Sequence, residues 1–154
     1  SEMTQAAHEQ MLASILESKQ KDPSYVPITL PTVPQIRMTR RIDGIYTMDD
    51  TEMFKEFPDA VGMFSDWRKR GPVYKLPFGT LYGKKVKNLI CAGRNISVTD
   101  AMWNITRVIP VCAVSGKAAG RAAAMTDDFA AFAANDLGKL QEKLPIGTFP
   151  PQNG

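Results

Sequence analysis

The residues best suited to chemistry lie between positions 88 and 124, where an apolar run ends at Gly93 and Arg94 and a helical pattern rich in glycine and alanine follows. The compact run over residues 86–93 predicts a buried strand that leads into a tight turn. A strand end and a helix N-terminus both present unpaired backbone N–H groups, and glycine allows a ligand close to the backbone. The segment therefore favours an anionic or electron-rich ligand.

Small residues recur along the helical pattern at steps of three and four, at Ala113, Gly116, Gly120 and Ala123 or Ala124. Such a smooth face suits a flat cofactor. It also suits close packing against another helix or a sheet, which is the commoner cause of a stripe of small residues. Spacing alone leaves both interpretations open. No GxGxxG follows a strand, and no phosphate-loop pattern occurs, so the chain lacks a primary nucleotide signature.

Two long motifs resemble a known family. Residues 76–97 read LPFGTLYGKKVKNLICAGRNIS, and residues 107–124 read RVIPVCAVSGKAAGRAAA. They resemble the C-terminal signature of the FAD-dependent oxidoreductase family related to the fumarate reductase and glucose-inhibited division flavoproteins. Upstream, TRRIDGIYTM at residues 39–48 resembles a strand of the same family. The resemblance spans roughly residues 37–126.

The resemblance implies FAD as cofactor, bound beside the strand end and the start of the following helix. A positive helix end near the flavin would stabilise its anionic reduced ring. The implied catalytic candidates are Arg40, Arg41 and Arg107, although Arg40 and Arg41 could equally be solvated charges on a strand edge. The implied cofactor-binding residues are Ala92, Gly93, Arg94, Ser97, Arg107, Val108, Pro110, Cys112 and Gly116.

The chain departs from the family pattern at three places. Residues 99–103 replace a segment that often contains histidine, and Met38 stands where glutamate is common. The N-terminal βαβ unit with its glycine-rich turn, which holds the ADP part, is missing. We therefore expect the C-terminal fragment of a larger flavoprotein, inactive alone, whose partners are the missing N-terminal FAD-binding portion, a small-molecule substrate and further copies of itself.

Two other functions remain open at this stage. The chain could be a non-enzymatic module that associates with itself through the glycine and alanine face and never binds flavin. It could also be a subunit that completes an FAD site with a separate partner chain. Co-purified flavin would separate the last alternative from the first.

Composition narrows the class of protein. The chain has 154 residues, is 44% hydrophobic and carries a formal charge of +3, which is too small an excess to indicate nucleic acid. Its two cysteines and one histidine lack metal-ligand spacing, so no metal site is expected. No signal pattern and no membrane-length apolar stretch occur. We expect a cytoplasmic protein without nucleic-acid or membrane partners.

The patterns predict a mixed α/β fold, an α+β fragment with several short strands and three to five helices. The expected helices cover residues 3–20, 49–58, 108–125, a segment after 126, and 135–144. Residues 25–34 predict an extended connector because they contain three prolines, and residues 35–48 predict a strand. One folded unit is expected over 1–154, with a substrate-side strand region at 25–82, the FAD-binding strand and helix at 83–126, and C-terminal helices at 127–154.

Overall fold

The computed structural model describes residues 2–34, 37–38 and 40–151. Its residues group into two compact units, Ser1–Thr39 and Arg40–Gly154, where one folded unit was expected. The approximate limits near residues 82 and 126, expected between regions of one folded unit, both fall inside the second unit.

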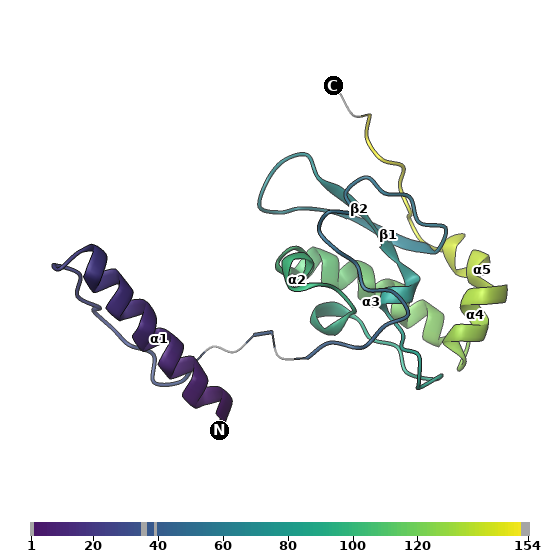
Figure 1. Cartoon of the computed structure of the whole chain (residues 1–154). Coiled ribbons are helices and arrows are strands. Elements are labelled where there is room, and N and C mark those ends of the chain that lie inside the picture. Colours follow the sequence, from purple (N-terminus) through teal and green to yellow (C-terminus); the bar gives the residue numbers. More distant parts are fainter. Residues whose placement is uncertain (1, 35–36, 39, 152–154) are drawn as a thin grey trace. The chain divides into compact units, whose positions relative to one another are not determined.

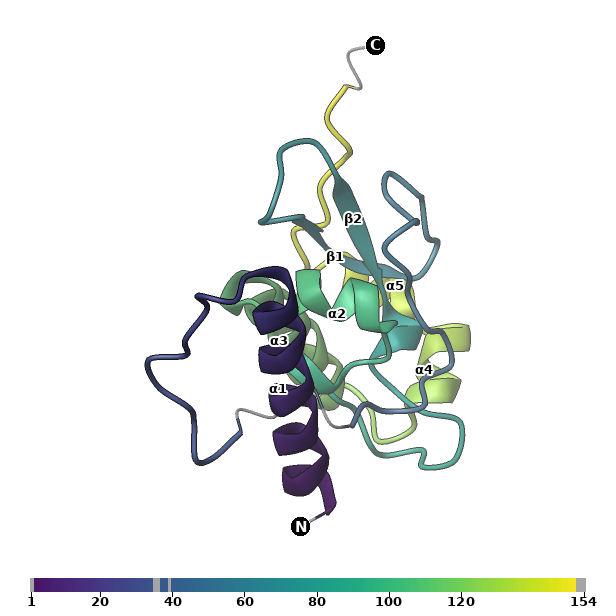
Figure 2. The same cartoon turned by 60° about the vertical axis from the view of Figure 1, so that its left-hand side comes forward.

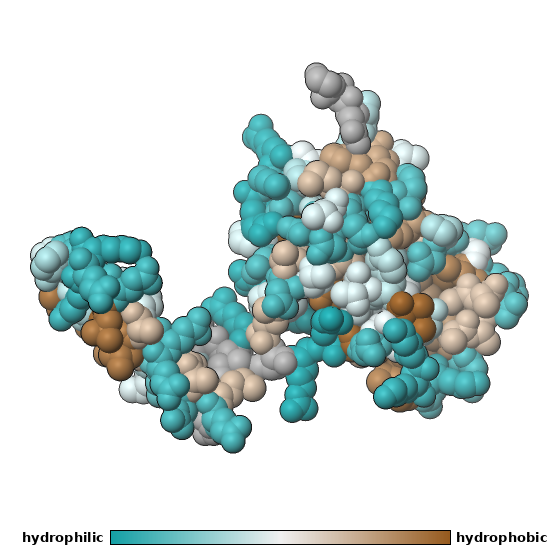
Figure 3. Space-filling model, in the orientation of Figure 1, coloured by the Kyte–Doolittle hydropathy of each residue, from teal (hydrophilic) through white to brown (hydrophobic). Residues whose placement is uncertain are grey.

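The first unit is built on one long helix, α1 (Glu2–Lys21), followed by a connector without regular structure over residues 24–34. Helix and connector confirm the expectations for these residues, and the helix ends where Asp22 and Pro23 follow. None of the described residues of this unit is buried. Apolar side chains gather on one side of the helix in Figure 3, and Met3, Leu12 and Leu16 are each about half exposed.

The second unit combines a small sheet with helices, which confirms the mixed α+β class. Strands β1 (Ala60–Ser65) and β2 (Val73–Pro77) pair antiparallel, with Phe64 opposite Tyr74. Helix α3 (Ile109–Ala123) packs against β1, as Figures 1 and 2 show from two directions. The helix thereby presents one face to the sheet and leaves its other face exposed.

Three shorter helices and two 3₁₀ turns complete the unit: α2 (Asp100–Thr106), α4 (Phe129–Asn135), α5 (Leu137–Gln141), η1 (Phe78–Thr80) and η2 (Gly93–Asn95). The side chains of Thr99 and Asp128 cap α2 and α4 by accepting hydrogen bonds from backbone N–H groups. Helices α4 and α5 confirm the expected C-terminal helices, whereas α2 was not expected from the sequence.

The prediction of a buried strand over residues 86–93 is wrong. Val86 and Leu89 are about half exposed, and the segment contributes only an isolated bridge between Ile90 and Tyr82. A strand buried on both faces needs neighbouring strands to pair with its N–H and C=O groups. Among the described residues, no such pair of neighbours flanks this segment.

The strand expected over residues 35–48 is also not formed where the structure describes it. Gln35, Ile36 and Thr39 lie outside the described residues. Residues 40–48 contribute isolated bridges, from Gly44 to Gly83 and from Met48 to Val98. The segment therefore holds its place through single contacts rather than a continuous ladder.

The helix expected from residue 49 to Pro58 is replaced by two turns. Glu52 accepts a hydrogen bond from the Asp49 N–H (3.0 Å), as at a helix start. Phe54 has a left-handed backbone (φ 58°), which ends any helix at this point. Glu52 also accepts hydrogen bonds from Tyr46 and Lys55, and these three bonds outweigh its burial and hold its pKa below the usual value.

Candidate functional site

The turn at Gly93 is the first part of the candidate site. Gly93 has φ +78°, a left-handed conformation that glycine adopts without strain, so the residue type fits the turn. Its backbone N–H donates to the Ser115 Oγ in α3 (2.9 Å). A Cβ at this position would lie 3.7 Å from the Cys112 Sγ. The turn η2 therefore rests directly on the first half of α3.

Ser115, which the sequence analysis missed, anchors this contact. Its side chain is fully buried, and its hydroxyl can donate to the carbonyl oxygens of Val111 (3.0 Å) or Cys112 (3.1 Å) while accepting from Gly93. A signal existed in the sequence. The buried face of α3 consists of Val111, Ser115, Ala118, Ala119 and Ala122, a helical stripe with one polar member.

The connector between α2 and α3 forms the second part of the site. The Arg94 Nε donates to the Arg107 carbonyl oxygen (3.4 Å), and the Trp103 Nε1 donates to the Arg94 carbonyl oxygen (3.0 Å). Val108 takes the N-cap position of α3 without a side-chain cap, and Pro110 lies in the first turn. This helix start consequently keeps backbone N–H groups that no side chain at the cap satisfies.

Cys112 lies where the turn and the connector meet. Its Sγ is 3.9 Å from the carbonyl oxygens of Thr106 and Arg107. Five implied cofactor residues, Gly93, Arg94, Arg107, Val108 and Cys112, thus belong to one cluster at the N-terminal end of α3. The other cysteine, Cys91, is partly buried, and burial raises its pKa.

Ser97 and Arg41 belong to a separate cluster, in which Ser97 and Gly44 are buried and Arg41 is exposed. The Ser97 Oγ accepts from the Arg41 Nη1 (3.1 Å) and the Gly44 N–H (3.2 Å), and it exchanges a hydrogen bond with the Thr47 Oγ1 (2.9 Å). Ser97 is fully buried. In this arrangement its side chain joins residues 41–47 to the segment that follows η2.

The remaining expected residues lie apart from the cluster or at its edge. Arg40 is exposed, and Ala92 has an extended backbone just before η2. Gly116 is exposed on α3, and a Cβ there would meet nothing within 4 Å. The face of α3 that carries Gly116 and Gly120 is therefore open to a flat group or to another element.

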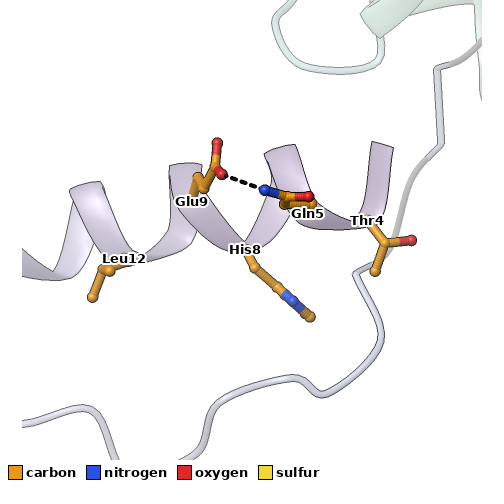
Figure 4. A pocket seen from close by; sticks show the side chains of 5 residues that line it. All are labelled: Thr4, Gln5, His8, Glu9 and Leu12. Carbon is orange, nitrogen blue, oxygen red and sulfur yellow. Dashed lines mark hydrogen bonds between the residues drawn. The ribbon is translucent and has the colours of Figure 1, made fainter. Parts of the chain in front are cut away.

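Besides a hollow over the loop between β1 and β2, two others lie elsewhere on the described surface. One, of about 210 Å³, is lined by residues that include Ile42, Lys85 and Leu89. The other, on α1, is shown in Figure 4: His8 and Leu12 point to the same side of the helix, and Gln5 donates to Glu9 (3.1 Å). Neither hollow contains residues of the cluster at α3.

The described residues hold no group of three or more histidine, cysteine or acidic side chains that could bind a metal ion. Within the same part of the chain, no helix combines the length and the apolar character that crossing a membrane requires.

The cluster fits an anionic, flat group in three respects. The left-handed turn at Gly93 brings backbone close to the surface without a side chain. The start of α3 has no side-chain cap. Arg107 has a buried Nε that finds no hydrogen-bond partner among the described residues. A phosphate or a negatively charged ring edge could satisfy such donors.

Comparison with known proteins defines the class. The family model of FAD dependent oxidoreductases matches residues 2–144. The chain belongs to this family, whose name implies an oxidoreductase that uses FAD. No curated protein and no solved structure matched the chain.

Proposed function

We propose that the chain is the C-terminal part of an FAD-dependent oxidoreductase related to the fumarate reductase and glucose-inhibited division flavoproteins. In this proposal it contributes one side of the flavin site and part of the substrate pocket. The observation that carries the proposal is the meeting of the Gly93 turn, the Arg107 connector and the uncapped start of α3, within a chain that matches the family over residues 2–144.

Each part of the cluster has a role that follows from its chemistry. Gly93 and Arg94 bind the phosphate or ribityl part, through close backbone approach and a guanidinium. The start of α3 faces the pyrimidine edge of the ring, where the positive helix end stabilises the reduced, anionic form. Bound FAD would supply the hydride chemistry itself. The protein thus binds, orients and supplies charge.

The exposed face of α3 is the surface that we propose covers the cofactor or packs against the rest of the flavin site. Ile109 is 82% exposed at its start, and Gly116 and Gly120 leave open space further along. Small side chains allow a ring or a second element to lie close to the helix. A second copy of the chain could use the same face, which would produce a homo-oligomer.

The visible absorption spectrum of the purified chain, with and without added FAD, tests this function. The two visible flavin bands are expected to shift as FAD saturates the chain, because the ring leaves water for a structured site. If the flavin bands do not shift at any FAD concentration, for the monomeric or the oligomeric chain, the result favours the non-enzymatic module instead.

A matched pair of variants locates the binding. Arg94→Gln removes the guanidinium beside the connector and should weaken FAD binding by about tenfold, since a charge-assisted hydrogen bond contributes at least about 1.4 kcal/mol. Arg121→Gln makes the same change at the exposed last turn of α3 and should leave binding unaltered. Equal weakening in both variants would indicate general charge attraction rather than this site.

A further inference from the structure

Arg107 lies over the rings of both tryptophans of the sequence. Its guanidinium carbon is 5.8 Å from the ring centroid of Trp67 and 5.5 Å from that of Trp103. Cation–π attraction to two indoles holds a planar guanidinium in one orientation. The two rings therefore clamp the Arg107 side chain.

Hydrogen bonds fix both rings of the clamp. The Trp67 Nε1 donates to the Asn104 carbonyl oxygen (3.0 Å), so the loop between β1 and β2 is tied to α2. The Trp103 Nε1 donates to the Arg94 carbonyl oxygen (3.0 Å), so α2 is tied to the turn η2. Indole N–H groups usually find such partners when the ring is partly buried. The clamp is thus anchored at the elements that form the candidate site.

The charge that the clamp holds lacks an anion. The Arg107 Nε is buried, and among the described residues it has no hydrogen-bond partner; none of the ion pairs in that part of the chain includes Arg107. Arg68, by contrast, lies in the loop that carries Trp67, and its Nη2 pairs with the Asp66 Oδ2 at 2.9 Å. Partly burying a charge without a partner is costly, and an unsatisfied polar group of this kind needs a functional explanation.

We propose that the clamped Arg107 guanidinium binds an oxyanion, a carboxylate or a phosphate, and that Trp67 and Trp103 are positioning residues for it. Three features support the chemistry: a guanidinium binds these groups through two parallel hydrogen bonds, Arg94 brings a second positive charge to the Arg107 carbonyl, and α3 begins two residues later. The inference rests on the proposed function in one respect, that the oxyanion belongs to the cofactor or the substrate of the flavin site.

Tryptophan fluorescence reports on this site directly, because both tryptophans form the clamp. The full chain is titrated with sodium pyrophosphate and, separately, with sodium succinate, against sodium chloride of equal ionic strength. A saturable change in emission is expected with an oxyanion and not with chloride. Tighter binding of pyrophosphate assigns the site to the cofactor phosphates, and tighter binding of succinate assigns it to a carboxylate substrate.

Variants test the clamp separately from the charge. Arg107→Gln should abolish the saturable change, and Arg121→Gln should preserve it. Arg107→Lys keeps the charge but loses the planar fork, and Trp67→Leu removes one ring, so each should weaken binding several-fold, as cation–π energies imply. Trp67→Phe should restore part of the loss. Far-ultraviolet circular dichroism identifies any variant that fails to fold.

The outcomes separate this inference from the flavin proposal. No saturable change in the wild-type chain, or an equal change in folded Arg107→Gln, would overturn the oxyanion site. If the flavin bands shift while neither anion alters the emission, the oxyanion site is wrong and the flavin proposal stands. If anions bind and FAD does not, the oxyanion site stands and the flavin proposal fails.

Discussion

Replacing Gly44 with alanine is expected to destabilise the second unit by about 2–3 kcal/mol, at the upper end of the range for overpacking a close-packed site. A Cβ at this position would lie 2.5 Å from the Ser97 Cβ and 2.9 Å from the carbonyl oxygens of Gly79 and Tyr46. Two of these neighbours are backbone atoms, which cannot rotate away. The Gly44 N–H also donates to the Ser97 Oγ, so a shift of the backbone would break that bond.

Denaturant unfolding followed by tryptophan fluorescence measures this effect, since Trp67 and Trp103 both lie in the second unit. Gly120→Ala is the matched control. It adds the same methyl group where nothing lies within 4 Å, in the interior of α3, and should stabilise the unit by roughly 0.5–1 kcal/mol. Two variants with equal midpoints would contradict the close approach at Gly44.

Replacing Ser115 with alanine is expected to have the second large effect, a loss of about 1–2 kcal/mol of stability together with weaker FAD binding. The change leaves the Gly93 N–H without its acceptor at 2.9 Å, beneath a turn that depends on that contact. Alanine is a better helix former than serine by a few tenths of a kcal/mol, which offsets part of the cost. The expected loss is the remainder.

Ser65→Ala provides the comparison for Ser115→Ala. Ser65 is exposed at the end of β1, and its replacement should change stability by less than about 0.5 kcal/mol. Stability is measured by denaturant unfolding, and FAD affinity by the visible flavin bands. If Ser115→Ala lowers stability but leaves the affinity for FAD unchanged, the Gly93 turn does not contribute to the flavin site.

Local patterns predicted most of the helices correctly, whereas the strand that they predicted over residues 86–93 is not formed. Helices satisfy their own backbone hydrogen bonds, so the apolar spacing in α1 and the Asp128 cap before α4 are sufficient signals. A strand depends on partners elsewhere in the chain. The short α2, although unexpected, carries a start signal of the same kind, since Thr99 caps it and Asp100 lies in its first turn.

The residues of the candidate site that belong to family motifs could be predicted from the sequence. Those that depend on contacts between distant segments could not. The motif around Gly93 and the one starting at Arg107 were both identified, and the structure brings them together at α3. Ser97 could not be placed from the sequence, because its partners Arg41 and Gly44 are more than fifty residues away. The clamp around Arg107 likewise depends on Trp67, forty residues upstream, and no local pattern joins the two.

The position of bound FAD is the most direct test of the account. Two-dimensional NMR of the ¹⁵N-labelled chain, titrated with FAD, reports each backbone amide separately. We predict that the amides of η2 and those of Val111 and Cys112 shift most, together with the two indole N–H signals. Shifts confined to α1 or to the hollow beside Leu89, or no saturable shift at all, would contradict a flavin site at the Gly93 turn and the start of α3.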